Sequence, residues 1–309
     1  MAGAALTPRP SPATLRTGTD RQILILANPT AGRFDPGVLE KIERRLAAAG
    51  YAVRLRLTER AGEIGTTCAD PTLSADVVVV AGGDGSINEA IAGFHETPAP
   101  RALAIVPFGT ANVLAQELGL PTAAEAVAET ILAGRTKPLH FGLANGRPFV
   151  LMASAGFDAE VVHAVPLALK RRLGKLAYVL TALRLAAQRR RGRDLLVEAA
   201  DIRFTCQLAV VTNGRCYGGP FVICREANVI EPGLHVVALE KDDPWSSFRA
   251  GLALVAGRLQ HSRGVRIVPV STVRISAADP IAAQIDGDPF GSTPLEIEPG
   301  PLPVPILVP

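Results

Sequence analysis

The residues best suited to chemistry lie in a glycine-rich stretch, GGDGSINEAI, at positions 82–91. Glycine-rich loops that open a helix commonly hold phosphate, because their backbone N–H groups and the positive end of the helix dipole attract anions. Gly82, Gly83 and Gly85 suit such a loop, but Asp84 lies among them and would repel a bare phosphate. The stretch has neither the GK[ST] of a Walker A loop nor the third glycine of a GxGxxG loop.

A helix is expected directly after this loop. Ser86 and Glu89 have the S-x-x-E spacing of a capping box, which predicts a helix that starts at Ser86 with its first N–H groups aimed back at the loop. Asp84 then has a simpler interpretation, as an acid that complements the helix dipole. Taken alone, the stretch leaves open a phosphoryl-transfer site and a plain strand–turn–helix corner.

The first part of the chain, residues 21–138, alternates between apolar runs and helical patterns. The predicted strands are 23–28, 51–58, 76–85 and 102–107, and the predicted helices are 38–50 and 122–134. This alternation predicts a parallel sheet covered by helices on both faces, with ligands at the carboxyl ends of its strands. The GGDGS loop and two others, NPTAGR at 28–33 and PFGTAN at 107–112, all fall at such ends.

The second part, residues 139–290, has a different pattern. Short strand-like runs separated by proline and glycine dominate it, which predicts a β-rich domain, most simply an antiparallel sandwich. Helices are expected only near 166–191 and 244–258. Residues 1–20 lack the apolar region of a signal peptide and are predicted to form a flexible tail.

Composition excludes several classes of protein. Of the 309 residues 48% are hydrophobic and 20% charged, as in a globular protein with a substantial core. The four cysteines show no CxxC spacing, which argues against a disulfide framework or a zinc site and favours a reducing compartment. No apolar run approaches the roughly 18 residues that span a bilayer. We therefore expect a cytoplasmic protein.

Three later blocks complete a pattern: ASAGFDAEV at 153–161, TNGRCYGGPF at 212–221 and IDGDPFGSTPLEI at 285–297. In this order and spacing, the six blocks resemble the diacylglycerol kinase catalytic domain family, which includes bacterial lipid kinases and sphingosine kinases. The resemblance covers roughly residues 21–308. It implies an α/β nucleotide-binding domain, a β-sandwich-like domain, and a C-terminal segment (291–309) whose strands return to the first domain.

The resemblance also implies roles for individual residues. ATP would lie between the domains, and Asp84 would either help to place Mg²⁺, which reverses its repulsion of phosphate, or accept the proton of the attacking hydroxyl. The positions implied to bind the nucleotide are Asn28, Arg33, Thr58, Gly82, Gly83, Gly85, Thr110 and Asn112. Plain structural interpretations remain: Asn-Pro is a common turn, and Thr110 and Asn112 suit the N-cap of a helix starting near Ala111.

The block at 285–297 holds a second candidate acid, Asp288. In many bacterial relatives this block reads DGE and its glutamate looks like the general base; Asp288 matches it with a side chain one methylene shorter. Asp286-Gly287-Asp288 is also typical of a hairpin turn. Either Asp84 or Asp288 could be the base. A further acid of the relatives' Mg²⁺ network is replaced by Pro232, which leaves the adjacent Glu231 as a candidate ligand.

The activity implied is an ATP- and Mg²⁺-dependent kinase that phosphorylates a lipid hydroxyl, with diacylglycerol as the expected acceptor. Sphingoid bases, phosphatidylglycerol and polyprenol-linked alcohols present comparable hydroxyls. An NAD kinase-like enzyme would share the GGDG loop but lacks a counterpart to PFGTAN at this spacing. A non-catalytic lipid- or nucleotide-binding protein would predict loss of the acids, which are present.

A basic segment of the chain could bring the enzyme to a lipid substrate at a membrane surface. Nine Lys/Arg residues and no acid lie between Val161 and Arg193. Five leucines share one face of the helix expected over 166–191: Leu169, Leu173, Leu176, Leu180 and Leu183. This helix would hold the enzyme peripherally on an anionic inner membrane surface, or pack its leucines into the core. With 5% aromatic residues, no nucleic acid partner is expected, and no pattern indicates an oligomeric state.

Overall fold

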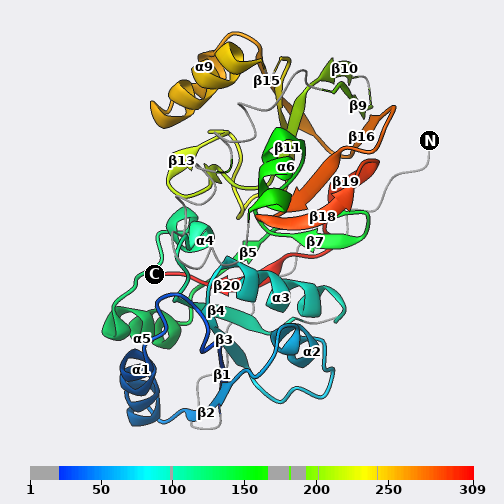
Figure 1. Cartoon of the computed structure of the whole chain (residues 1–309). Coiled ribbons are helices and arrows are strands. Elements are labelled where there is room, and N and C mark those ends of the chain that lie inside the picture. The colour runs from blue at the N-terminus through cyan, green and yellow to red at the C-terminus, as the bar shows by residue number, and fades with distance from the viewer. Residues whose placement is uncertain (1–20, 98–99, 166–180, 182–192, 201, 242) are drawn as a thin grey trace, which may run out of the picture.

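The chain folds into two domains that lie end to end, as the computed structural model in Figure 1 shows. The structure describes residues 21–97, 100–165, 181, 193–200, 202–241 and 243–309. The helix predicted over 166–191 therefore lies outside the described residues, apart from Thr181, and so does the tail predicted over 1–20.

The first domain is built on a six-stranded sheet of order β2-β1-β3-β4-β20-β5. Its strands are β1 Gln22–Ala27, β2 Ala52–Leu57, β3 Val77–Gly82, β4 Ala102–Pro107, β5 Thr136–Leu139 and β20 Val304–Leu307. Strands β1 to β4 and β20 pair in parallel, whereas β5 pairs antiparallel with β20. The C-terminal strand thus completes the first sheet, although it follows the whole second domain in sequence.

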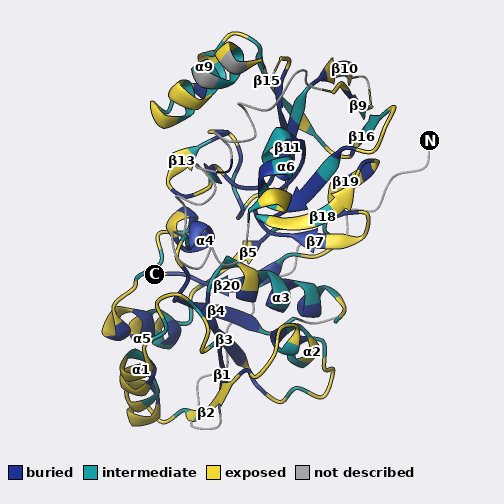
Figure 2. Ribbon diagram, in the orientation of Figure 1, coloured by how far each residue is buried: buried dark blue, intermediate teal, exposed yellow. Residues whose placement is uncertain are grey.

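Helices cover both faces of this sheet because successive side chains of its buried strands alternate between the two faces. The helices are α1 Pro36–Ala48, α2 Glu63–Cys68, α3 Asp84–His95, α4 Val113–Glu117 and α5 Ala124–Ala133. On β1, Ile23 and Ile25 pack in one cluster with α1 and α5, while Leu24 and Leu26 pack in another with α2 and α3. Figure 2 shows the buried strands between these layers.

The second domain is a sandwich of two antiparallel sheets. One has the order β10-β9-β16-β19-β6-β7 and the other β15-β14-β11-β8-β17-β18. The strands of the first are β6 Gly142–Ala144, β7 Arg147–Phe149, β9 Leu195–Ala199, β10 Ile202–Cys206, β16 Val273–Ala277 and β19 Leu295–Pro299. Those of the second are β8 Met152–Gly156, β11 Leu208–Thr212, β14 Leu234–Leu239, β15 Val265–Val270, β17 Ala282–Ile285 and β18 Asp288–Ser292. Their facing side chains form one buried core.

Smaller elements complete this domain: α6 Phe157–Ala164, α9 Pro244–Val255, the short 3-10 helix η1 Leu259–His261, and the two-stranded sheet of β12 Cys216–Tyr217 with β13 Phe221–Val222. On β11, Val211 faces the sandwich core, while Val210 belongs to a cluster shared with the first domain. A continuous apolar core therefore joins the two domains, and the fold class predicted from the sequence is confirmed.

Candidate active site

The three polar loops meet at the carboxyl ends of β1, β3 and β4. The N–H of Asn28 donates to the carbonyl of Ala81 at 2.9 Å, and that of Phe108 donates to Gly82 at 2.9 Å. The N–H of Arg33 in turn donates to the carbonyl of Phe108 at 2.8 Å. Main-chain hydrogen bonds therefore hold the NPTAGR, GGDGS and PFGTAN loops together as one unit.

Two glycines allow these loops to approach each other closely. A Cβ atom on Gly109 would lie 2.6 Å from the Cα of Gly83, and one on Gly83 would lie 3.1 Å from the Cα of Gly109. A side chain at Gly109 would collide with the opposite backbone, and one at Gly83 would require that backbone to shift by a few tenths of an ångström. Gly85 differs, because a Cβ there would meet nothing within 4 Å; it lines the cleft described below.

Helix α3 begins at Asp84, so the start predicted at Ser86 is wrong by two residues. Gly83 occupies the N-cap position and no side chain caps the helix. Ser86 is buried, and its hydroxyl oxygen accepts from the Asn28 side-chain amide at 3.3 Å instead. The capping-box pattern failed here because Ser86 lies inside the first turn, where its hydroxyl joins two loops.

Asp84 itself caps a different helix. Its two carboxylate oxygens accept from the backbone N–H groups of Val113 at 3.1 Å and Leu114 at 3.2 Å, which open α4. The helix predicted to begin near Ala111 thus starts at Val113 and takes its cap from another loop. Asp84 consequently fixes α4 in place, and loss of its carboxylate would leave the first N–H groups of this helix without their acceptor.

Asn112, which precedes α4, has a left-handed backbone conformation with φ of 47°. Its side-chain amide donates to the carbonyls of Pro107 at 3.0 Å and Gly109 at 2.8 Å, and so closes the PFGTAN loop. The other predicted contacts lie around this unit: Thr110 and Arg33 are exposed, while Thr58 is buried with its hydroxyl 3.4 Å from the carbonyl of Ala27. None of these four lines the cleft described next.

An open cleft of about 430 Å³ lies between the two domains. The first domain contributes Asn28, Ala31, Gly32, Gly83, Gly85, Ser86, Asn88, Glu89, Ala92 and Gly109 to its lining. The second domain contributes Arg147, Pro148 and Asp288. Of the predicted residues, the cleft therefore brings together Asn28, Gly83, Gly85 and Asp288.

Asp288 reaches the cleft from a tight hairpin between β17 and β18. Asp286 and Gly287 form the turn with φ of 48° and 85°, the left-handed pair that a two-residue hairpin of this kind requires. The Gly287 N–H donates to the side-chain oxygen of Gln284 at 2.7 Å, which fixes the turn from within. The predicted hairpin turn is therefore present, and the same hairpin places Asp288 at the cleft. The side chain of Asp288 is exposed there.

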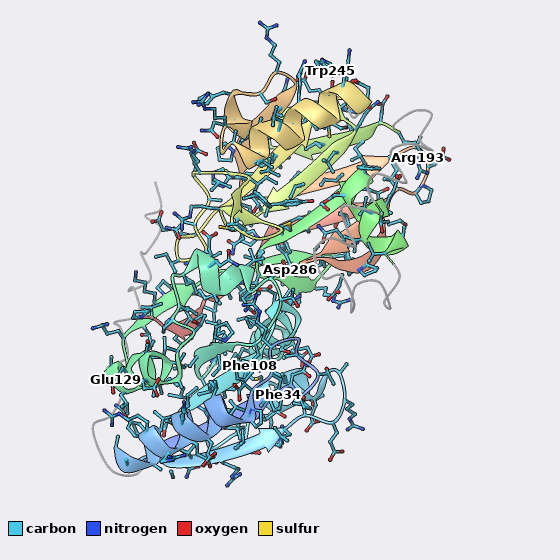
Figure 3. All side chains as sticks on the ribbon, turned by 60° about the vertical axis from the view of Figure 1, so that its left-hand side comes forward. Phe34, Phe108, Glu129, Arg193, Trp245 and Asp286 are labelled. Carbon is cyan, nitrogen blue, oxygen red and sulfur yellow. The ribbon has the colours of Figure 1, made fainter. Side chains whose placement is uncertain are left out.

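Asp286 is the anchor of this hairpin. Its carboxylate accepts hydrogen bonds from three backbone N–H groups at and just before the start of β8: Val150 at 2.7 Å, Leu151 at 2.9 Å and Met152 at 2.8 Å. Burial, together with the charge of Asp84, raises the pKa of Asp286 to about 6, against the lowering effect of those N–H groups. Figure 3 places Asp286 at the junction of the two domains.

Replacement of Asp286 by alanine is expected to lower the free energy of unfolding by about 3 kcal/mol, because three buried N–H groups lose a charged acceptor. Urea unfolding of the Asp286→Ala variant measures this change. Asp288→Ala is the matched control, since it removes an exposed carboxylate only two residues away and should change stability by less than about 0.5 kcal/mol. Equal stability of both variants would show that the hydrogen bonds of Asp286 do not anchor the hairpin.

Helix α4 also connects the GGDG loop to the second domain. At its C-terminal end Glu117, whose side chain is 1% exposed, accepts from the Nε of Arg215 at 2.9 Å and from the N–H of Cys216 at 2.9 Å. A buried carboxylate needs such partners to stay charged. Because Asp84 holds the start of α4 and Arg215 lies just before β12, this helix fixes the GGDG loop relative to the sandwich.

The described residues include no group of three or more His, Cys, Asp or Glu side chains arranged to hold a metal ion. Glu231, the candidate ligand, lies outside the cleft lining, and its Oε1 accepts from the side chain of Asn228 at 2.9 Å. Asp84 lies in the GGDG loop, and Glu89 and Asp288 line the cleft. This set suits an ion such as Mg²⁺, which takes one or two protein carboxylates and obtains its other ligands from phosphate and water.

Nine of the thirteen residues that line the cleft were not predicted as site residues, among them Asn88, Glu89 and Arg147. Asn88 and Glu89 lie on the first turns of α3, three and four residues after Gly85. This spacing places them on the same side of the helix as Gly85, so it could have indicated that they line the cleft. Arg147 had no such signal, because it lies in a three-residue strand after an Asn145-Gly146 turn. Its guanidinium lies 5.6 Å from the ring centre of Phe290, on the same hairpin as Asp288.

Comparison with known proteins agrees with this arrangement. Residues 22–144 match the family described as diacylglycerol kinase catalytic domain, and residues 152–308 match the YegS C-terminal NAD kinase beta sandwich-like domain. The chain belongs to the diacylglycerol kinase family of lipid kinases. It is accordingly a phosphotransferase with an alcohol group as acceptor, and the resemblance stated above is confirmed.

Individual relatives of this family cover most of both chains. The chain is 30% identical to a protein of Pseudomonas aeruginosa named "Probable lipid kinase YegS-like", over 88% of each chain. It is 25% identical to the diacylglycerol kinase of Bacillus subtilis (strain 168), over 88% of this chain and 91% of that one. A solved structure from Bacillus anthracis str. Sterne superimposes with a TM-score of 0.80 at 22% identity, covering 97% of this chain and 99% of that one.

Proposed function

We propose that this lipid kinase transfers the γ-phosphate of ATP, with Mg²⁺, to the hydroxyl of diacylglycerol. The observation that carries the proposal is the interdomain cleft, where Asp288 of the second domain and the GGDG loop of the first line one space. Phosphoryl transfer requires mainly positioning, charge neutralisation and a group that orients the nucleophile. A cleft between two domains supplies these from opposite sides.

The nucleotide side of the cleft is the first domain. Asn28, Gly32 and Gly85 line it, and the N-terminus of α3 directs its first N–H groups toward bound phosphate. Asp84, Glu89 and Asp288 would hold a Mg²⁺ ion that accompanies ATP, and this ion would supply neutralisation of the phosphate charge. Burial and, to a smaller extent, the charge of Asp84 raise the pKa of Asp286, as expected where carboxylates lie near one another, and a cation is favourable beside such groups.

We assign the general base to Asp288. Both oxygens of Asp84 accept backbone N–H groups of α4, so that Asp84 serves to hold the loop and its charge in place. Asp288 is exposed at the cleft on a hairpin fixed by Asp286. Its carboxylate accepts the proton of the lipid hydroxyl while that oxygen bonds to the γ-phosphorus; the bond from this phosphorus to the β–γ bridging oxygen breaks, and ADP leaves.

Arg147 is proposed to hold a phosphate oxygen from the second domain, because it is the arginine that lines the cleft among the described residues. Arg147→Ala is expected to raise the KM for ATP by about tenfold, the loss of one charge-assisted hydrogen bond, with a smaller change in kcat. The control is Arg274→Ala, an exposed arginine that pairs with Glu296 in the sandwich. Steady-state kinetics at varied ATP concentration measures the KM for ATP of both variants. An unchanged KM in Arg147→Ala would contradict the proposed role of Arg147.

The location proposed is the cytoplasmic face of the inner membrane, with peripheral attachment through the basic segment at 166–191. The proposal depends on the sequence of that segment, since its described part is Thr181 alone. Within the described residues, no helix is both long and apolar enough to cross a membrane.

The acceptor is tested by following labelled γ-phosphate from Mg-ATP into a panel of compounds. Diacylglycerol, a sphingoid base, phosphatidylglycerol and a polyprenol-linked alcohol are presented in mixed micelles, and NAD in solution. We expect label in diacylglycerol. Label in another lipid would show that this lipid, and not diacylglycerol, is the acceptor. Label in NAD would indicate a dinucleotide kinase. ATP binding without transfer to any of these compounds would indicate a non-catalytic binding protein.

A further inference from the structure

Helix α9 exposes an apolar face at the outer end of the second domain. Trp245 is 66% exposed, Leu252 59% and Val255 66%. Their spacing of seven and three residues puts them on one side of the helix. The opposite side packs against the core through Ala250, Ala253 and Leu254. Figures 2 and 3 show this exposed helix, with Trp245 far from Asp286 and the cleft.

This concentration of apolar side chains is unusual within the described chain. Seven large hydrophobic residues are exposed there, and three of them lie on this one helix. A fourth, Phe221, lies on β13, an element that contacts α9. Exposed hydrophobic residues that occur singly need no explanation, but a group of them marks an interaction surface.

The charge around α9 indicates what kind of surface it meets. From residue 244 to residue 270 the sequence contains four arginines and no acid: Arg249, Arg258, Arg263 and Arg266. Arg249 donates to the carbonyl of Arg263 at 2.9 Å, so the loop after the helix folds back beside it. Asp243, just before the helix, accepts from the N–H groups of Trp245 and Ser246 and serves as its N-cap.

We propose that the outer face of α9 docks the enzyme on an anionic phospholipid bilayer. Trp245, Leu252 and Val255 enter the interface between headgroups and acyl chains, where tryptophan is favoured. Arg249, Arg258 and Arg263 contact lipid phosphates, whereas Arg266 pairs with Glu240 at 3.6 Å. This deepens the proposed function and rests on it, because a diacylglycerol acceptor lies in such a bilayer. A second copy of the chain fits less well, since it would bring the same arginines together.

Trp245 allows a direct test, because it is the only tryptophan in the chain and its emission reports on α9 alone. With vesicles of phosphatidylcholine and phosphatidylglycerol, we expect a blue shift of the emission and quenching by lipids brominated on their acyl chains. Vesicles of phosphatidylcholine alone should produce a much weaker change. Protein that sediments with the anionic vesicles while its emission stays unchanged would overturn the proposal, because another surface would then bind.

Matched variants give the second test. Leu252→Ser/Val255→Ser keeps the reporter and should weaken vesicle binding by about tenfold or more. Leu57→Ser/Leu302→Ser removes two other exposed leucines, 49% and 57% exposed, and should leave binding unchanged. Equal binding by the α9 variant and the wild type would overturn the inference. So would a change of oligomeric state in the α9 variant alone, measured by light scattering, because the face would then join two copies.

Activity separates this inference from the proposed function. Toward a short-chain diacylglycerol dispersed in solution, the α9 variant should keep the wild-type kcat/KM, whereas toward diacylglycerol in anionic vesicles it should lose about tenfold or more. Equal losses on both acceptors would contradict a docking role. If the wild type phosphorylates no acceptor, the proposed function fails, and the fluorescence experiment still decides whether α9 docks.

Discussion

Asp288→Asn is expected to lower kcat for phosphoryl transfer by two to four orders of magnitude, the range typical for removal of a general base. Asparagine keeps the size of the side chain but cannot accept the proton of the lipid hydroxyl. Because Asp288 is exposed and lies on the second domain, the variant should fold normally and bind ATP as the wild type does. Single-turnover transfer, with ATP binding measured by calorimetry on the same samples, gives both quantities.

Asp288→Glu is the informative companion to this variant. The family resemblance implies a glutamate at the matching position, so the longer carboxylate should support transfer at a rate within about tenfold of the wild type. Activity in both Asp288→Asn and Asp288→Glu would show that no proton acceptor is needed here. Inactivity in both would indicate that the position is sensitive to shape rather than to basicity.

Asp84→Ala is expected to have the second large effect, a loss of transfer of at least about a thousandfold together with reduced stability. The carboxylate supplies charge beside the transferred phosphate, and it also caps α4 through Val113 and Leu114. Loss of a helix cap costs about 1 kcal/mol. Radiolabel transfer and thermal unfolding of the same preparation measure the two parts.

A second helix-capping aspartate, outside the cleft, separates those parts. Asp35 caps α1 by accepting from the Gly37 N–H at 2.8 Å and does not line the cleft, so Asp35→Ala should lose comparable stability and keep its activity. If Asp35→Ala and Asp84→Ala lose the same stability but only the second loses transfer, the carboxylate of Asp84 acts in the chemistry. If Asp84→Ala keeps most of its transfer rate, Asp84 is a helix cap and nothing more.

The layered architecture was predictable from local pattern. A β-branched run indicated β3 and a terminal glycine indicated the end of α5, and both elements begin and end within three residues of the expected positions. The same holds for the loops at the strand ends, because the geometry of a parallel sheet brings them together. Short strand-like runs indicated the β-rich second domain, and the family resemblance added the C-terminal strand that returns to the first domain.

The interior of the site was less predictable, because its contacts join residues far apart in sequence. Ser86 fits a local capping pattern, yet its hydroxyl accepts from Asn28, 58 residues away. The sequence around Asp286 predicts a hairpin turn. No local signal indicates that its carboxylate accepts hydrogen bonds from N–H groups 134 to 136 residues away. Arg147 enters the cleft only because the two domains face each other there.

The measurement closest to the central claim is a crystal structure of the protein with Mg²⁺ and a non-hydrolysable ATP analogue. The phosphates are predicted to lie in the cleft between Gly85 and Asp288, with the terminal phosphate nearest the second domain. A nucleotide bound elsewhere, with Asp288 on a side of the molecule that its phosphates do not face, would contradict the assignment of this cleft as the place where phosphate is transferred.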